Sequence, residues 1–194
     1  QIARTGVGDG EQLGRAIVMA CEGLDDCEVA FLIGFQGLSI DQDRLAAIEQ
    51  ILAGEDHITL VTVRAAEYLR DLGYSVSSDI LQAHPNIDVI ASVGDQMTLG
   101  TRLAVEDYGL EDQIKLIGNG ASQDGYRAVE DGRMFATIVN IPYTNGLIAA
   151  QMAVQALEGE LLVRSVNMYE QSPPIPASGP IITLDNLAEF EPEW

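Results

Sequence analysis

The chain has 194 residues, which is enough to bury a sizeable core in one large domain or two small ones. Apolar residues make up 47% of the sequence, but no stretch approaches the roughly 18 consecutive apolar positions of a membrane-spanning helix. Thirty acidic residues against ten basic ones give a formal net charge of −20, so nucleic acid and anionic lipid surfaces would be repelled. The composition therefore predicts a folded, water-soluble chain that does not bind nucleic acid.

Short apolar runs alternate with helical patterns along most of the chain. The runs are rich in β-branched residues and predict strands buried on both faces of a parallel sheet, at residues 29–33, 58–63, 89–93, 114–117 and 135–139. Helices are predicted at about 39–54, 72–84, 96–109, 122–132 and 144–159. Ser39 and Gln42 have the spacing of a capping box at the start of the first of these helices. The alternation predicts an α/β fold with a doubly wound, Rossmann-like parallel sheet.

The pattern changes after residue 160. Residues 161–168 could form a further strand, and four prolines between 171 and 180 predict an extended loop. Residues 181–194 then predict a short strand with an acidic tail.

Cys21 and Cys27 flank a short Gly-Leu-Asp-Asp turn. They would form a disulfide in an oxidising compartment, or remain two buried thiols elsewhere. The first residues lack the basic and apolar regions of an export signal, so the protein is either cytosolic or exported by a signal that lies upstream. His57 and His84 are the only histidines, and the glycines at 6–10 lack the spacing of a nucleotide-binding loop. No metal ion or other cofactor is predicted.

Polar and aromatic residues gather where the predicted strands end, which is the edge at which open α/β sheets bind ligands. They combine directed hydrogen-bonding groups with flat apolar faces, as polyol sites do, and comprise Asp9, Phe35, Gln36, Arg44, Tyr68, Gly94, Asp95, Asn119 and Asn140. Neither histidine nor a serine elbow falls at this edge, so an enzyme is disfavoured.

Each of these residues also has a purely structural interpretation. Asp95 could cap the helix that follows it, and Asn140 could tie a loop. Arg44 could pair with Glu67 or Asp95 in the scaffold. Only their shared position at one edge of the sheet favours a ligand site.

Residues 84–100, HPNIDVIASVGDQMTLG, resemble a segment of the ribose-type periplasmic binding proteins, the sugar-binding subunits of ABC importers, and of the related LacI-type repressors. Val7-Gly8-Asp9 and the Thr137–Pro142 segment also resemble motifs of this family. The resemblance implies the second lobe of a type I periplasmic binding protein with leftover first-lobe elements. The implied parts are a first-lobe remnant at 1–24, the ligand-binding lobe at 25–140, a first-lobe crossover helix at 141–160, and C-terminal strands, loop and tail at 161–194.

The same resemblance implies roles for individual residues. Asp9 would contact ligand from the first lobe, and Arg44 would contact it from the second, although Ala47 and Ile48 replace the glycine and phenylalanine of the family's R-x-x-G-F motif. Tyr68 falls where members place an aromatic ring against the sugar. Asn140 stands at a glutamine ligand position.

Two departures from the family pattern concern the ligand itself. Gly94 replaces an asparagine, and Gly118-Asn119-Gly120 replaces a Gly-Phe-Asp motif, so two polar anchors have become glycine. Glycine opens volume and removes hydrogen bonds, which argues against plain ribose and for a larger or differently oriented ligand.

The predicted function is therefore the solute-binding component of an ABC-type importer, with a sugar or related polyol held between two lobes. A sensor or signalling relative and a LacI-type effector domain are the alternatives, and an enzyme is less favoured. The implied partners are ABC permease subunits, and the implied location is periplasmic or extracellular at the membrane. The apolar face of the 144–158 helix would be exposed, which predicts a homodimer of the chain through that face.

Overall fold

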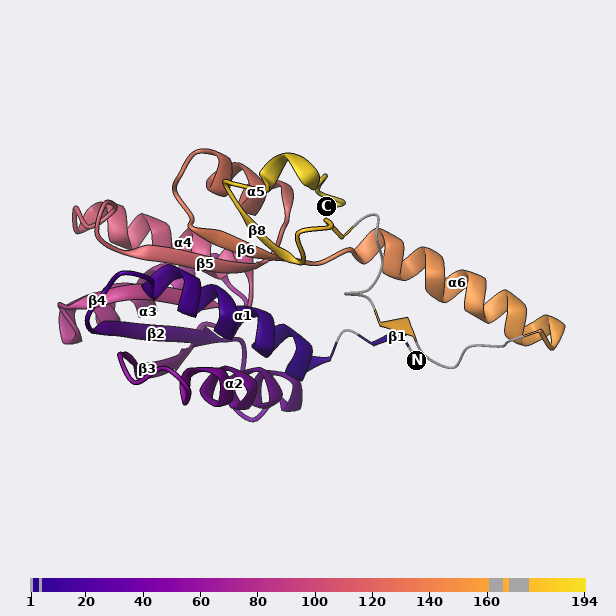
Figure 1. The fold of residues 1–194 in the computed structure, drawn as a ribbon, viewed down its shortest axis with the longest axis horizontal. Helices are drawn as coiled ribbons and strands as arrows, with labels where there is room; N and C mark the ends of the chain where they lie inside the picture. Colours follow the sequence, from indigo (N-terminus) through magenta and orange to yellow (C-terminus); the bar gives the residue numbers. More distant parts are fainter. Residues whose placement is uncertain (1, 4, 161–165, 168–174) are drawn as a thin grey trace.

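A computed structural model describes residues 2–3, 5–160, 166–167 and 175–194. Its centre is a six-stranded sheet in the order β3-β2-β4-β5-β6-β8, in which every neighbouring pair is parallel except β6 and β8 (Figure 1). The strands of this sheet are β2 (Cys27–Ile33), β3 (Ile58–Ala65), β4 (Ile87–Ser92), β5 (Lys115–Gly120), β6 (Ala136–Val139) and β8 (Ile181–Thr183). The predicted doubly wound α/β fold is confirmed.

Helices cover both faces of the sheet. They are α1 (Gly6–Cys21), α2 (Ser39–Leu52), α3 (Arg70–Ala83), α4 (Asp95–Asp107) and α5 (Gln123–Glu130). The β2–α2–β3 connection runs toward one edge and β3–α3–β4 runs back past β2, so right-handed crossovers place α2 and α3 on opposite faces. Helix α1 packs on α2, and α3 packs on α4. Fully buried residues such as Phe31, Ile90 and Ile117 fill the space between sheet and helices.

Helix α1 belongs to this same core. Leu13 and Ile17 are fully buried, and a side chain at Gly10 would collide with the backbone of Arg44 in α2. Glycine therefore lets the two helices approach closely. The assignment of residues 1–24 to a remnant of the first lobe is wrong for residues 6–21, because the apolar face of α1 is buried against the sheet and α2 rather than left for an absent domain.

The start of α2 also differs from the sequence prediction. The helix begins at Ser39 with Leu38 as its N-cap, and no side chain caps it. Instead, the Asp41 carboxylate in the first turn accepts a hydrogen bond from the Phe35 backbone N–H at 2.9 Å. The predicted capping box is wrong because this carboxylate ties the helix to the preceding loop rather than to its own N-terminus.

Helix α6 (Pro142–Glu158) follows β6 and projects away from the sheet (Figure 1). None of its residues is buried, and Leu147, Val154 and Leu157 are exposed, which confirms the predicted exposed apolar face. Near it, β1 (Ile2–Ala3) and β7 (Val166–Asn167) form a small parallel pair. Among the described helices, none combines the length and the apolar character that crossing a bilayer requires.

The end of the chain returns to the sheet. Strand β8 pairs antiparallel with β6, and the short 3-10 helix η2 (Leu187–Glu189) lies between it and the tail. Leu187 and Phe190 are buried in the core. The predicted short strand near 181 is confirmed, whereas most of the strand expected at 161–168 and the first part of the proline-rich loop lie outside the described residues.

A disulfide joins Cys21, at the end of α1, to Cys27, at the start of β2. The sequence left open whether these residues are linked or free, and the structure links them. The bond closes a short loop at the edge of the sheet opposite to the carboxyl ends of the parallel strands. Its effect on stability is therefore separable from ligand binding.

We expect the Cys21→Ala/Cys27→Ala variant to lose about 2 kcal/mol of unfolding free energy, because the short closed loop restricts the unfolded chain. Urea unfolding measures this loss. A reducing agent should lower the stability of the wild type by a similar amount and leave the variant unchanged. Two free thiols in protein recovered from an oxidising compartment would contradict the expectation.

Candidate functional site

The first group of candidate residues lies where α1 and α2 begin. Arg44 donates from Nη2 and Nε to Asp9 Oδ2, at 2.7 and 3.1 Å. Its Nη1 donates to Asp41 Oδ1 and to the Tyr68 hydroxyl, both at 2.9 Å. The Tyr68 hydroxyl in turn donates to Asp41 Oδ1 at 2.6 Å. Two carboxylates, one guanidinium and one phenol thus form a single network, called here the Arg44 network.

The Arg44 network is largely shielded from solvent. The side chains of Asp9 and Asp41 are fully buried, and that of Arg44 is 10% exposed. Burial by itself lowers the pKa of Arg44, but the charge of Asp9 and its hydrogen bond raise it, and the net direction is upward. Arg44 therefore stays positively charged and offsets part of the negative charge of the two buried carboxylates.

An aromatic pair lies beside the network. The rings of Phe35 and Tyr68 are tilted, with centroids 5.9 Å apart. A side chain at Gly34 would collide with the Tyr68 ring, so only glycine admits it there. Tyr68 has a left-handed backbone with φ of 58°, which is uncommon for a non-glycine residue and turns the ring back toward the sheet. Phe35 is 45% exposed, and Gln36 next to it is exposed, so both can meet a ligand.

The second group surrounds Asp95, the first residue of α4. Its Oδ1 accepts from the Thr137 hydroxyl at 2.7 Å, and its Oδ2 accepts from the Ser122 backbone N–H and hydroxyl, both at 2.8 Å. A side chain at Gly118 or Gly125 would collide with this carboxylate. Asp95 is buried, so it fastens α4, the β5–α5 loop and β6 together rather than facing solvent.

The other predicted residues lie around this carboxylate. Asn119 is buried in β5, and Asn140, half-buried at the exit of β6, donates its backbone N–H to the Gly120 carbonyl at 3.2 Å. Gly94 is the N-cap of α4. A Cβ on Gly94 would lie 2.9 Å from Gln96 Oε1, so the amide of Gln96 occupies the space above this glycine.

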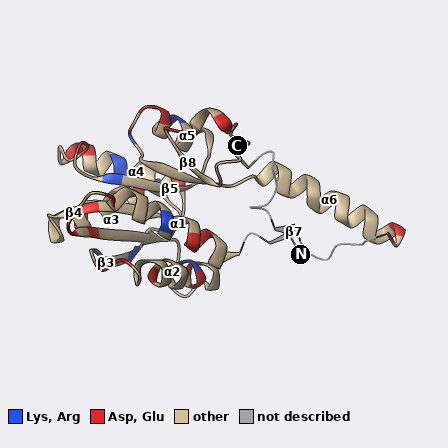
Figure 2. Ribbon diagram, viewed as in Figure 1, with Lys and Arg blue, Asp and Glu red and all other residues tan. Residues whose placement is uncertain are grey.

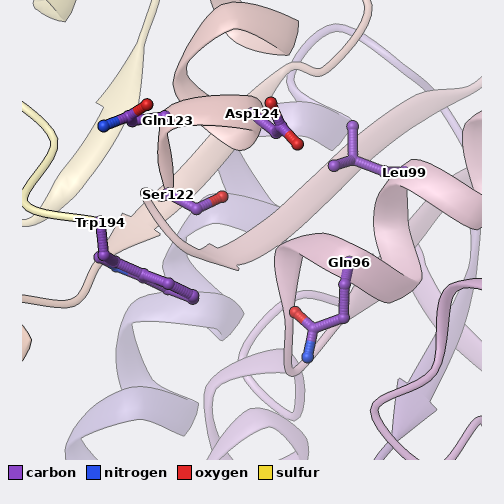
Figure 3. A pocket seen from close by; sticks show the side chains of 6 residues that line it. All are labelled: Gln96, Leu99, Ser122, Gln123, Asp124 and Trp194. Atoms are coloured by element: carbon purple, nitrogen blue, oxygen red, sulfur yellow. The ribbon is translucent and has the colours of Figure 1, made fainter.

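A hollow of about 390 Å³ opens beside the second group, lined by Gln96, Leu99, Ser122, Gln123, Asp124 and Trp194 (Figure 3). In the figure, the indole of Trp194 and the amide of Gln96 lie on either side of Ser122. The lining residues come from the start of α4, the start of α5 and the tail. The hollow therefore lies at the carboxyl edge of the sheet, where the sequence predicted the ligand.

The structure thus brings the predicted residues together at one edge, in two groups. Asp9, Arg44, Phe35 and Tyr68 form one group with Gln36 nearby, and Gly94, Asp95, Asn119 and Asn140 surround the other. Asp9 was expected on a first lobe, and this is wrong because Asp9 lies on α1, within the sheet domain. The alternative partners Glu67 and Asp95 for Arg44 are also wrong, since its partners are Asp9 and Asp41.

The predicted site residues omit Asp41 of the Arg44 network and all six residues that line the hollow, Trp194 among them. Asp41 lies three positions before Arg44 in α2, a spacing that favours an ion pair within a helix. Trp194 had no local signal, because its place depends on the whole tail returning along β8. Among the described residues, no three His, Cys, Asp or Glu side chains are grouped as metal ligands.

A family model described as a periplasmic binding protein domain matches residues 8–161, which is most of the chain. The chain belongs to this periplasmic binding protein family. This membership confirms the resemblance to periplasmic binding proteins that the sequence motifs indicated.

The chain is 29% identical over 136 residues to the ribose import binding protein RbsB of Salmonella typhimurium, a match that covers 70% of this chain and 45% of that protein. The chain spans about half the length of the curated relatives it matches. The similarity therefore concerns only part of each relative.

Solved structures share the fold. A periplasmic solute binding protein of an ABC transporter from Actinobacillus succinogenes, with bound D-allose, has a TM-score of 0.86 and 20% identity, covering 97% of this chain and 62% of that one. The Caulobacter myo-inositol binding protein has a TM-score of 0.82 and 24% identity, covering 98% and 62%. At these identities the likeness shows the fold alone.

We expect Arg44→Ala to lower the unfolding free energy by about 3 kcal/mol, because it leaves two buried carboxylates without their counter-charge. Denaturant unfolding measures the loss. Arg15→Ala, which removes an exposed arginine of α1, is the matched control and should change stability by less than about 0.5 kcal/mol. Equal unfolding midpoints for wild type and Arg44→Ala would contradict this account.

The Tyr68 hydroxyl should lose its proton at a higher pH than a free tyrosine does. Burial and its hydrogen bond to Asp41 raise the pKa of Tyr68 to about 12, above the ordinary value of 10.0. A raised native pKa stabilises the fold fully below pH 10, and this contribution is lost as the pH rises from 10 to 12. Tyr68→Phe should remove that part of the alkaline loss. The difference in phenolate absorbance between wild type and Tyr68→Phe reports the pKa, and a midpoint near 10 would contradict it.

Proposed function

We propose that this chain is part of the solute-binding component of an ABC-type importer and binds a sugar or related polyol. The observation that carries the proposal is the carboxyl edge of the sheet, where exposed aromatic faces lie beside amide, hydroxyl and carboxylate groups in a periplasmic binding protein domain. Relatives and structural neighbours with names that specify ribose, D-allose and myo-inositol support a neutral, hydroxyl-rich ligand.

The candidate residues differ in whether their side chains are exposed to a ligand. Phe35 and Gln36 are exposed and would touch the ligand, whereas Asp9 and Asp95 are buried and would position their neighbours. Arg44 uses four of its five N–H donors within the Arg44 network, at Nε, Nη2 and twice at Nη1. One N–H is left to donate to a ligand hydroxyl. Asn140 would contribute from the exit of β6.

We infer that ligand bridges this domain and a second lobe in the full-length gene product, and favours a closed form by contacting both. Binding would take place in the periplasm or outside the cell at the membrane, and the closed form would dock on ABC permease subunits. The exposed face of α6 would be covered by the other lobe, or by a second copy when this chain stands alone. The mass of this chain alone in solution shows whether a second copy covers the α6 face when the other lobe is absent.

The alternatives receive less support. An effector domain of a LacI-type repressor would have to dock beside DNA, which a net charge of −20 opposes. A sensor would use the same fold and the same ligand chemistry, so it differs from the proposal only in what the closed form binds. No catalytic acid, base and nucleophile meet at the carboxyl edge among the described residues, and an enzyme is not proposed.

The test is a thermal-shift screen of pentoses, hexoses and cyclic polyols on the full-length gene product. A cognate sugar at about 100 times its Kd should stabilise the fold by about 2.7 kcal/mol. Phe35→Ala should weaken binding by about tenfold, because an aromatic platform contributes about 1.4 kcal/mol.

Leu24→Ala is the matched control for Phe35→Ala. Leu24 is similarly exposed, but it lies in the α1–β2 turn at the opposite edge of the sheet, so its loss should leave the affinity unchanged. A screen in which no sugar or polyol raises the melting temperature would contradict the proposed function.

A further inference from the structure

The tail of the chain is fastened to the rest of the protein at several points, two of which lie at the candidate site. The indole Nε1 of Trp194 donates to the Gly120 carbonyl at 3.1 Å, and the Trp194 carbonyl accepts from the Gln123 backbone N–H at 2.6 Å. The Glu193 carboxylate accepts from the Thr144 backbone N–H at 3.0 Å and from its hydroxyl. Phe190 is buried in the core. The tail therefore holds Trp194 in one position rather than leaving it loose.

The indole stands where β5 ends. A Cβ on Gly120 would lie 3.0 Å from Trp194 Cζ2, so the ring occupies space that a side chain at position 120 would need. At the neighbouring strand, the Gln96 amide occupies the space above Gly94 in the same way. These two glycines replace the polar anchors of the ribose-type pattern. The groups that cover them come from a tail residue and from the first turn of α4.

Trp194 still presents a free face. Its indole edge is used by the hydrogen bond to Gly120, yet the residue is 45% exposed and lines the hollow of about 390 Å³ with Gln96 and Ser122 (Figure 3). A flat apolar face that is held in place loses little conformational freedom when a ligand packs on it. Amide and hydroxyl groups around the ring can bond to the hydroxyls at the edge of that ligand.

We propose that Trp194 is a ligand-binding and specificity-determining residue of the sugar site, on which one face of a six-membered sugar ring stacks while Gln96 bonds to its hydroxyls. This inference rests on the proposed function and deepens it. A pyranose ring has a face of C–H groups that matches the indole. An open-chain polyol has no such face and binds this surface more weakly.

The experiment is a titration of the full-length gene product with hexopyranoses and with the open-chain polyols of the same carbon number. Trp194 is the only tryptophan of this sequence, so the emission difference between wild type and Trp194→Phe reports its environment. A bound hexose should change that emission in a saturable way. Trp194→Ala should raise the Kd for the hexose by about tenfold, and Trp194→Phe should raise it less because a ring remains.

Tyr108→Ala is the matched control, because Tyr108 is 42% exposed but lies at the end of α4, away from the carboxyl edge. It should leave the Kd unchanged, and equal melting temperatures without sugar show that each variant is folded. A Trp194→Ala protein that binds the hexose within twofold of wild type overturns this inference and leaves the proposed function standing. A wild type that binds the open-chain polyol as tightly as the hexose does the same. Absence of any sugar or polyol binding to the wild type overturns both.

Discussion

The parallel arrangement of β3, β2, β4, β5 and β6 is the constraint on which the rest of the molecule depends. Parallel strands all end at the same edge, so every loop that follows a strand is delivered to one surface. Residues far apart in the sequence, such as Phe35, Gln96 and Asn140, therefore reach this edge without any direct interaction between them. The tail reaches it by a different route, through an antiparallel pairing of β8 with β6.

Two buried groups of bonded side chains, the Arg44 network and the groups around Asp95, connect these loops to one another. The Arg44 network joins the starts of α1 and α2 to the β3–α3 loop, and Asp95 joins α4 to the β5–α5 loop and β6. Both groups are satisfied within the protein, which is the condition for burying charge. Their polar groups are therefore mostly unavailable to a ligand. What remains available is mostly aromatic faces, amides and hydroxyls, together with the exposed Asp124 carboxylate at the hollow.

The charged residues lie mainly on the sheet domain and not on α6. Figure 2 shows acidic residues spread over the helices and loops of the domain, while α6 is largely uncharged along its length. The exposed apolar residues of α6 would be unfavourable in a free monomer. The net charge of −20 favours solubility, whereas the exposed apolar residues of α6 favour association.

The sequence by itself determined the order of strands and helices from β2 to α6, because short β-branched runs and helical stripes carry a local period that survives without tertiary contacts. It also placed Phe35, Arg44, Asp95 and Asn140 at one edge, since that follows from parallel connectivity alone. It did not predict helix α1. The sequence did not determine which of these side chains form bonds within the protein and are therefore unavailable to a ligand. Arg44 could have faced the ligand or a carboxylate. The packing of α1 on α2 made Asp9 its partner, whereas Asp41 lies three residues before it in the same helix.

The tertiary structure also determined which groups lie against Gly94 and Gly120 and where the tail packs. From the sequence, Gly94 and Gly120 predict open space in the site. The neighbouring residues in the sequence do not indicate which group occupies that space. In the folded chain the Gln96 amide and the Trp194 indole occupy that space. Trp194 is 74 residues from Gly120 in the sequence, and a contact over that distance depends on β8 pairing with β6, which no periodic pattern in the sequence encodes.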